Sequence, residues 1–311
     1  MLLRVWGIKS FSMYGDGGDI GDTRIAEQIG HQSLGRPFEE LYRELTAAPA
    51  AFHVKTHEIP TDGQRAIYIV RDGRSASRSY CRYRQDFNGC AREAETLRDV
   101  ILGFTAFGSW SNHLDAWDPL NRPGTLLLKY EDLLESPREQ IPRIAEFIGL
   151  EPRQSWQNNF EELARLEPRY FRAGGANRPE EALAPPDRDL FWMLHAPWMR
   201  RLGYISQDFD TQVPEMPDLF RRSLYHAVAD QLGRIAGAEL RAQALADELD
   251  RARSDNDADR RSADETAQRL RVTQAQHNAL RDRLDSIARS RVLRAAKALR
   301  LAHLPNWFGQ R

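Results

Sequence analysis

Residues 66–80 read AIYIVRDGRSASRSY, and this stretch decides the fold class. Its first five residues form a continuous apolar and β-branched run, which is typical of a short strand buried on both faces. At Arg71 the run stops and a basic, serine-rich segment begins. The sequence therefore predicts a buried strand that ends by delivering Arg71 to the edge of a sheet.

Two more apolar runs have the same character, FHVK at 52–55 and TLLLKY at 125–130. Helical patterns occupy 92–117 and 137–148, and the second begins with a proline, which suits a first helical turn. Strands that alternate with helices predict an α/β fold, with a parallel sheet covered by flanking helices.

The composition changes near residue 215, and we predict an α/β domain over 1–215 and a helical coiled-coil tail over 216–311. The tail allows a seven-residue register whose seam includes Leu249, Thr266 and Thr273, with a polar middle around Asn256 and Asp259. We expect the coiled coil to make the protein a homo-oligomer. The alternative is one long solvated helix without a partner.

Composition bounds the partners and the compartment. With a net charge of −1, the chain has no global field that favours nucleic acid or an anionic membrane as a partner, and we expect neither. Two cysteines, Cys81 and Cys90, provide neither a disulfide framework nor metal-ligand spacing, which fits a reducing compartment. The first residues do not form a secretory signal, and no run approaches the length of a transmembrane segment. We expect a cytoplasmic protein without a metal site.

The polar residues that follow the strands are the candidates for chemistry, because ligands bind at the carboxyl ends of parallel strands. Arg71 and the serines after it would join a helix start and a guanidinium into an anion site. The alternative is a capped helix beside a surface arginine. Lys55 and His57 follow another strand and together offer a base near neutral pH and a fixed positive charge.

Four segments together resemble the sulfotransferases of the bacterial type that use 3′-phosphoadenosine 5′-phosphosulfate (PAPS). They are VKTHEIP, AIYIVRDGRSASRSYCRY, FGSWSNHLDAW and LLLKYEDLLESPREQIPRIAEFIGL. Order and spacing match over about residues 2–205. The resemblance implies a P-loop NTPase-like sulfotransferase fold and transfer of a sulfuryl group from PAPS to a hydroxyl acceptor, without a metal. A P-loop kinase is disfavoured because GxxxxGK[ST] is absent from the sequence.

The resemblance also assigns the nucleotide-binding residues. Arg71 and Ser79 match the pair that holds the 3′-phosphate, and Tyr130 matches the tyrosine beside the adenine. YFRAGGANRP at 170–179 resembles the loop that closes over the 3′-phosphate, with Arg172 and Gly174 in the family's positions. The end of that loop departs from the family's glycine and tryptophan, which puts its closing geometry in doubt.

For catalysis, the resemblance implies that His57 is the general base and that Lys55 steadies the sulfuryl oxygens. Trp110, His113 and Trp117 recur at helical spacing, so we expect them on one helix face, in the core or in the wall of the acceptor pocket.

The family's first strand and its loop around the 5′-phosphosulfate have no counterpart here, and LLR at 2–4 resembles the helix after that loop. We therefore expect the sheet to lack a strand near its middle. A start codon assigned too late, a decayed gene and a binding protein descended from an enzyme would each explain this. We favour the first, because every later motif keeps its chemistry.

Two alternatives remain open for function. The chain is an enzyme whose acceptor is a carbohydrate or another small hydroxyl compound, or it is an impaired relative that binds PAPS or its product and acts as a coiled-coil interaction protein. The carbohydrate reading depends on SRVLRAAKALR at 290–300, which resembles tails of bacterial glycan-assembly proteins. The same segment also reads as a basic amphipathic helix end.

Overall fold

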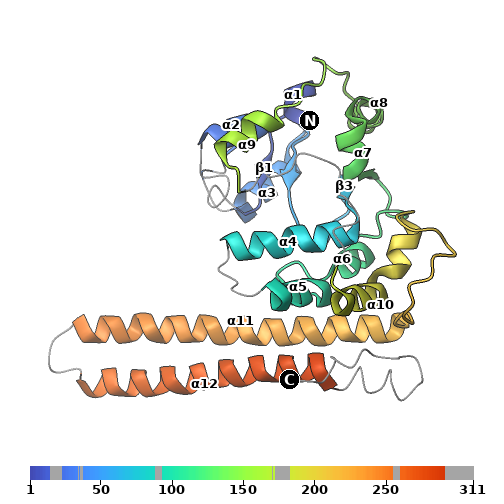
Figure 1. Ribbon diagram of the computed structural model, residues 1–311. Helices are drawn as coiled ribbons and strands as arrows, with labels where there is room; N and C mark the ends of the chain where they lie inside the picture. The colour runs from blue at the N-terminus through green and yellow to red at the C-terminus, as the bar shows by residue number, and fades with distance from the viewer. Residues whose placement is uncertain are drawn as a thin grey trace. The chain divides into compact units, whose positions relative to one another are not determined.

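A computed structural model describes residues 1–14, 23–33, 35, 38–87, 93–169, 171, 183–254 and 260–290 (Figure 1). Its helices and strands follow one another in the order α1 Leu2–Trp6, β1 Phe11–Ser12, α2 Thr23–Ile29, α3 Phe38–Ala47, β2 Val54–Lys55, β3 Ala66–Val70, α4 Gly73–Phe87, α5 Glu93–Leu102, α6 Trp110–Trp117, β4 Thr125–Lys129, α7 Tyr130–Glu135, α8 Pro137–Ile148, α9 Phe160–Leu166, α10 Pro185–Arg201, α11 Asp218–Ser254 and α12 Arg260–Ser290. The predicted α/β class is confirmed, with short parallel strands among many helices.

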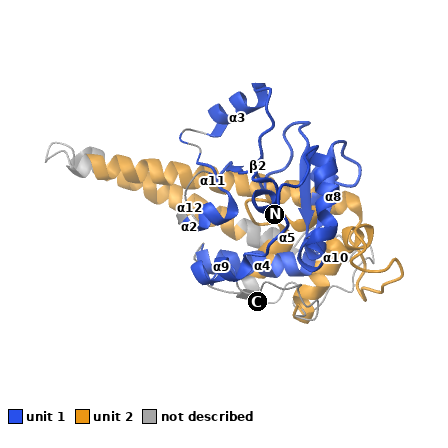
Figure 2. Ribbon diagram, turned by 90° about the horizontal axis from the view of Figure 1, so that it is seen from above, with its two compact units in different colours: residues 1–91, 114–181 blue, residues 92–113, 182–311 orange. Residues whose placement is uncertain are grey.

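The chain forms two compact units, which Figure 2 colours separately. The first contains residues 1–91 and 114–181, and with them the four strands found in the described part of the chain; the second contains residues 92–113 and 182–311. The domain boundary that we predict at residue 215 falls within the second unit, and the division into a domain and a tail stays a prediction.

The strands of the first unit pair in parallel, as predicted, but the pairs form two separate two-stranded sheets within the described residues. β1 pairs with β2, which is only two residues long, and β3 pairs with β4 over five. We expect the family's first strand, which has no counterpart here, to belong near the middle of one continuous sheet. Our expectation that the sheet lacks such a strand remains a prediction.

Burial varies along β3. Val70 is 1% exposed, whereas Ile69 on the opposite face is 55% exposed. Ile67, on the same face as Ile69, packs against the hydrophobic cluster of the first unit, so the prediction of burial on both faces is wrong only at Ile69. The partner strand β4 contributes Leu128, which packs in this cluster with Val5 and Trp6 of α1 and Ile144 of α8.

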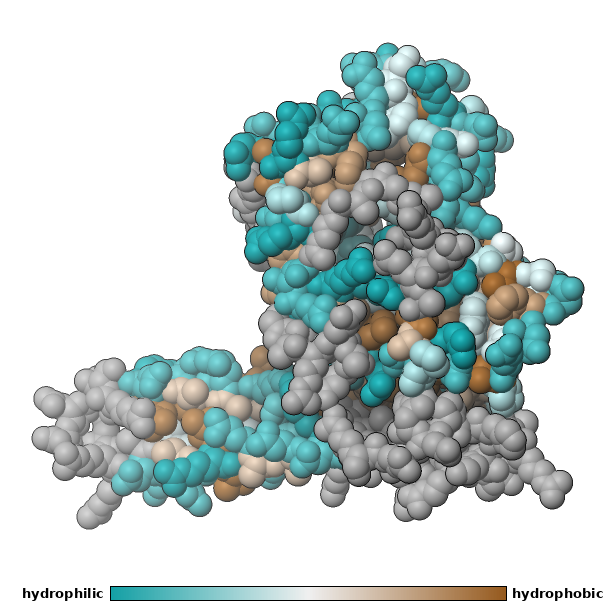
Figure 3. All heavy atoms as spheres, viewed as in Figure 1, coloured by the Kyte–Doolittle hydropathy of each residue, from teal (hydrophilic) through white to brown (hydrophobic). Residues whose placement is uncertain are grey.

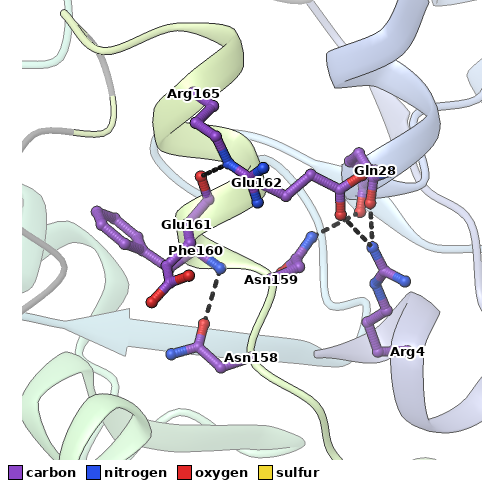
Figure 4. Close-up of polar contacts among 8 residues, drawn as sticks. All are labelled: Arg4, Gln28, Asn158, Asn159, Phe160, Glu161, Glu162 and Arg165. Atoms are coloured by element: carbon purple, nitrogen blue, oxygen red, sulfur yellow. Dashed lines mark hydrogen bonds and ion pairs between the residues drawn. The ribbon is translucent and has the colours of Figure 1, made fainter.

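A polar network joins α1, α2 and α9 in the first unit (Figure 4). The Arg4 guanidinium donates a hydrogen bond to the side-chain oxygen of Gln28, and the Gln28 amide donates to Glu162 at 2.7 Å. Asn159, just before α9, donates to the backbone carbonyl of Gln28 at 3.4 Å. Because these three helices are five to seven residues long, such cross-links add stability that their own turns lack.

The helix expected over 92–117 is two helices, α5 and α6, separated by a turn at Gly103. Gly103 has φ +88°, and a Cβ atom there would lie 2.6 Å from the backbone nitrogen of Ser109. Only glycine fits such a left-handed, closely approached position, so the helical pattern could not continue through it.

A fully buried histidine lies in the second unit. Nδ1 of His195 is 2.7 Å from the Ser111 hydroxyl, and Nε2 is 3.1 Å from the Ile101 carbonyl. A neutral ring satisfies both contacts, with Nε2–H as donor to the carbonyl and Nδ1 as acceptor. Burial is the main cause that lowers the pKa of His195 to about 3. The interaction connects α10, α6 and the end of α5 through neutral partners.

The helical tail is a hairpin in the second unit, with α11 and α12 side by side (Figure 1). Glu239 of α11 contacts His277 at 2.9 Å and Arg281 at 3.3 Å, both on α12. The colours of Figure 1 show that the two helices run antiparallel. Predicted seam positions Leu249, Thr266 and Thr273 are buried. The polar middle of the predicted register, 255–259, lies outside the described residues. Self-association remains a prediction.

The outer surface of the hairpin is mostly hydrophilic, with isolated hydrophobic side chains (Figure 3). Leu240 of α11 is 73% exposed and Val272 of α12 is 49% exposed. Among the described helices, none combines the length and the apolar character that crossing a membrane requires.

Candidate active site

Arg71 and Tyr130 lie together at the carboxyl ends of β3 and β4. The register pairs Val70 with Lys129, so the next residue of each strand falls at the same edge of the sheet. The Arg71 guanidinium carbon lies 4.7 Å from the centroid of the Tyr130 ring, and both residues are half-buried. A guanidinium stacked on an aromatic face keeps its in-plane N–H donors for oxygen acceptors. This pair is suited to bind an anion.

The helix that follows β3 is capped by a carboxylate. One Asp72 carboxylate oxygen accepts the Arg74 backbone N–H at 2.9 Å, and the same oxygen receives the Arg74 side-chain Nε–H at 3.0 Å. The cap that we considered as an alternative is therefore present, but Arg71 is half-buried rather than a surface residue. Because Asp72 satisfies an N–H group at the start of α4, an anion here would depend on arginine more than on the helix terminus.

A hydrogen bond also joins the residues that follow β3 and β4. The Asp72 backbone N–H donates to a Glu131 carboxylate oxygen at 3.0 Å. The sequence places Glu131 among the polar residues that follow β4, without a role, and the parallel register of β3 and β4 brings it to the Asp72 N–H.

The serines after Arg71 differ in exposure. Ser75 and Ser77 are 9% and 2% exposed, so their hydroxyls lie inside the first unit. Ser79 is exposed on α4 and is the serine of this helix that we expect to contact a ligand. Its partnership with Arg71 on one phosphate stays a prediction.

The other strand end carries Lys55 and His57, both exposed. Lys55 is the last residue of β2 and pairs with Ser12 of β1. Tyr14 and His57 lie two residues beyond Ser12 and Lys55, and their rings stack, with centroids 5.6 Å apart and planes inclined by 20°. Convergence of this strand end with that of Arg71 on a single nucleotide remains a prediction.

Two predicted residues lie outside the described part of the chain, Arg172 and Gly174, as does most of the 170–179 loop. The described residues include no group of three or more histidine, cysteine, aspartate or glutamate side chains placed to hold a metal. Sequence reasoning missed Tyr14, for which the only signal is its register opposite His57.

Trp117, which we expected on a helix face, contributes to the surroundings of the His57 turn. Its indole N–H donates to the Glu58 carbonyl at 2.9 Å, and its ring contacts Tyr68 with centroids 5.5 Å apart. Burial raises the pKa of Tyr68 well above its ordinary value, so that hydroxyl remains neutral. Trp117 therefore packs against β3 and holds the loop after β2, and its place in the wall of an acceptor pocket stays a prediction.

Comparisons with known proteins agree with the resemblance seen in the sequence. Residues 37–171 match the family model described as the sulfotransferase domain. Mouse sulfotransferase 1B1 is 29% identical over 119 residues, which are 33% of this chain and 39% of that protein. Flavonol 3-sulfotransferase of Flaveria bidentis is 27% identical over 175 residues, which are 49% of this chain and 55% of that protein.

Cytosolic sulfotransferase 6 of Arabidopsis thaliana is 33% identical over 92 residues, 27% of this chain and 28% of that protein. A solved structure, that of mouse sulfotransferase SULT7A1 complexed with PAP, is 18% identical with a TM-score of 0.43, and the match covers 73% of this chain and 90% of that one. The chain spans between about a quarter and just over half of the length of these curated relatives. The matches support the sulfotransferase family for residues 37–171.

Proposed function

We propose that the chain is a sulfotransferase that moves a sulfuryl group from PAPS to a hydroxyl acceptor. The observation that carries the proposal is the stacking of Arg71 on Tyr130 at two adjacent strand ends, within the segment that matches the sulfotransferase domain. Lys55, His57 and Ser79 belong to the same segment.

Charge and hydrogen-bonding geometry support this assignment. The 3′-phosphate is a tetrahedral dianion, and two N–H groups of a guanidinium can bind two of its oxygens at once. Arg71 and Ser79 would hold this group. Tyr130, whose ring already lies against a planar cation, would flank the adenine. Arg172 and Gly174 would close the site from the 170–179 loop.

The reaction breaks the bond between sulfur and a phosphate oxygen of PAPS and forms a bond between sulfur and the acceptor oxygen. His57 would take the proton of the acceptor hydroxyl, and 3′-phosphoadenosine 5′-phosphate (PAP) would leave with the electron pair of the broken bond. The transferred group carries spread negative charge, so positioning and cationic donors contribute most of the catalysis. Lys55 would supply that charge at the sulfuryl oxygens.

The acceptor and the assembly belong to the same proposal. A carbohydrate hydroxyl is our candidate acceptor, in the cytoplasm, and a homo-oligomer through the helical tail is our candidate assembly. Neither requires nucleic acid or a metal.

The test is transfer of labelled sulfate from PAPS to a panel of sugars, phenols and alcohols, with PAP release as the second readout. We expect sulfated product, and we expect His57→Gln to lower kcat about 10²- to 10⁴-fold while PAP affinity is kept. His226→Gln is the control, because His226 is exposed on α11. PAP binding without any transfer supports the impaired relative instead, and absence of both contradicts the proposal.

A further inference from the structure

The turn that carries His57 is held by an aromatic residue from the neighbouring strand. β1 pairs Phe11 with Val54 and Ser12 with Lys55, an offset of 43 residues. The backbone hydrogen bond from the Met13 N–H to the Lys55 carbonyl continues the ladder by one residue. The same offset places Tyr14 opposite His57, so the contact between them follows from strand pairing.

Tyr14 contacts this turn through both its ring and its hydroxyl. The ring stacks on the imidazole, at 5.6 Å between centroids and 20° between planes. The hydroxyl oxygen accepts the backbone N–H of His57 at 2.6 Å and donates to a Glu58 carboxylate oxygen at 3.3 Å. Burial is the main cause that raises the pKa of Tyr14, so its hydroxyl keeps the proton that it donates.

Further bonds hold the turn from inside and from α6. The Glu58 N–H donates to the Thr56 hydroxyl at 3.0 Å, which closes a local turn around His57. On the side of α6, the Trp117 indole donates to the Glu58 carbonyl at 2.9 Å. The backbone of the turn is thus held by Tyr14 and Trp117, and Tyr14 also stacks on the imidazole.

From this arrangement we propose that Tyr14 is a positioning residue that fixes the ring orientation of His57 for proton transfer. The proposal rests on the proposed function of His57 as the base. An exposed histidine samples several rotamers, and only one of them directs a ring nitrogen at a given hydroxyl. A stacked tyrosine restricts that choice before the acceptor arrives. Misplacement of a catalytic group by about 1 Å can cost about 10²-fold in rate, so the effect on kcat is measurable.

The placement is tested by NMR of the full chain, independently of activity. The chain has eight histidines, and the ring-proton signals of His57 are assigned as those that disappear in His57→Gln. A ring stacked above them shields them, so we expect Tyr14→Leu to move these signals downfield. Tyr14→Phe keeps the ring and should keep most of the shielding. Tyr42→Phe is the matched control, because its hydroxyl contacts Asp62 in the same loop without contacting His57.

The catalytic consequence is tested by kinetics on the same variants. We expect Tyr14→Leu to lower kcat about 10- to 100-fold, Tyr14→Phe to fall between it and the wild type, and PAP affinity to stay unchanged in both. Unchanged His57 signals in Tyr14→Leu overturn the proposal, as does an unchanged kcat after those signals have moved. If the wild-type chain transfers no sulfate, the proposed function fails, and the NMR comparison alone then decides whether Tyr14 fixes the ring of His57.

Discussion

The Arg71 guanidinium lies over the Tyr130 ring, 4.7 Å from its centroid, although 59 residues separate the two in the chain. The parallel register of β3 and β4 accounts for this, because the same offset of 59 pairs Val70 with Lys129 and brings the Asp72 N–H to Glu131. An arginine held at the edge of a sheet in this way loses little freedom on binding an anion.

The Tyr130 ring should contribute to nucleotide binding through its face rather than through its hydroxyl. We expect Tyr130→Ala to weaken PAP binding about 2- to 12-fold, which corresponds to the loss of an aromatic stacking contact with the adenine of about 0.5–1.5 kcal/mol. Tyr130→Phe keeps the ring and should bind nearly as the wild type does. Titration calorimetry measures both, and equal losses in the two variants would point to the hydroxyl instead.

The bond between the two strand ends should stabilise the first unit. Glu131→Ala removes the acceptor of the Asp72 N–H, and we expect the free energy of unfolding to fall by about 1–2 kcal/mol. Glu131→Gln keeps an acceptor oxygen and should cost less. Glu135, which is exposed on the same helix, is the control, and its alanine variant should unfold in urea as the wild type does. Equal effects at both positions would contradict this role for Glu131.

Buried His195 should make stability depend on pH. Its pKa is about 3 in the folded chain, against an ordinary value near 6.5, so between these values the unfolded chain binds a proton that the folded chain does not. Stability should therefore decrease as pH falls below 6.5, by up to about 1.4 kcal/mol per pH unit. Urea unfolding at several pH values measures the slope. In His195→Gln the free energy of unfolding should change less with pH. An unchanged pH dependence would mean that groups other than His195 cause it.

The helical hairpin gives a direct test of self-association. We expect sedimentation equilibrium of the full chain to give a multiple of 35.7 kDa. Leu240 is 73% exposed on α11, and Leu240→Lys should lower that mass if a second copy covers this face. A wild-type mass of 35.7 kDa at micromolar concentration would show a monomer and contradict the predicted homo-oligomer.

The parts of the fold that could be predicted are those with strong local signals. β3 coincides with the run AIYIV, and α8 begins and ends where the proline start and the apolar period indicate, at Pro137 and Ile148. The prediction of helix over 92–117 was wrong in the middle of that range. The turn at Gly103 depends on a close approach to Ser109, which the spacing of apolar residues does not reveal. β1 has two residues, too few for any pattern.

The candidate site could likewise be predicted only where its residues directly follow a strand in the sequence. Strand ends identified Lys55, His57 and Arg71 as polar groups leaving a sheet, because that reasoning needs only the sequence. Tyr14 acts through strand register, which no single segment encodes, so the pairing of β1 with β2 was required to find it. Glu131 was recognisable as a polar residue after its strand, but its bond to the Asp72 N–H depends on the pairing of β3 with β4.

The central claim is that Arg71 binds the 3′-phosphate of the nucleotide, and PAP binding by titration calorimetry tests it most directly. We predict that the wild-type chain binds PAP more tightly than ATP. We also predict that Arg71→Ala weakens PAP binding at least about 30-fold, from a loss of about 2 kcal/mol or more, whereas alanine at exposed Arg138 changes nothing. Equal affinity for PAP in the wild type and in Arg71→Ala would contradict the account.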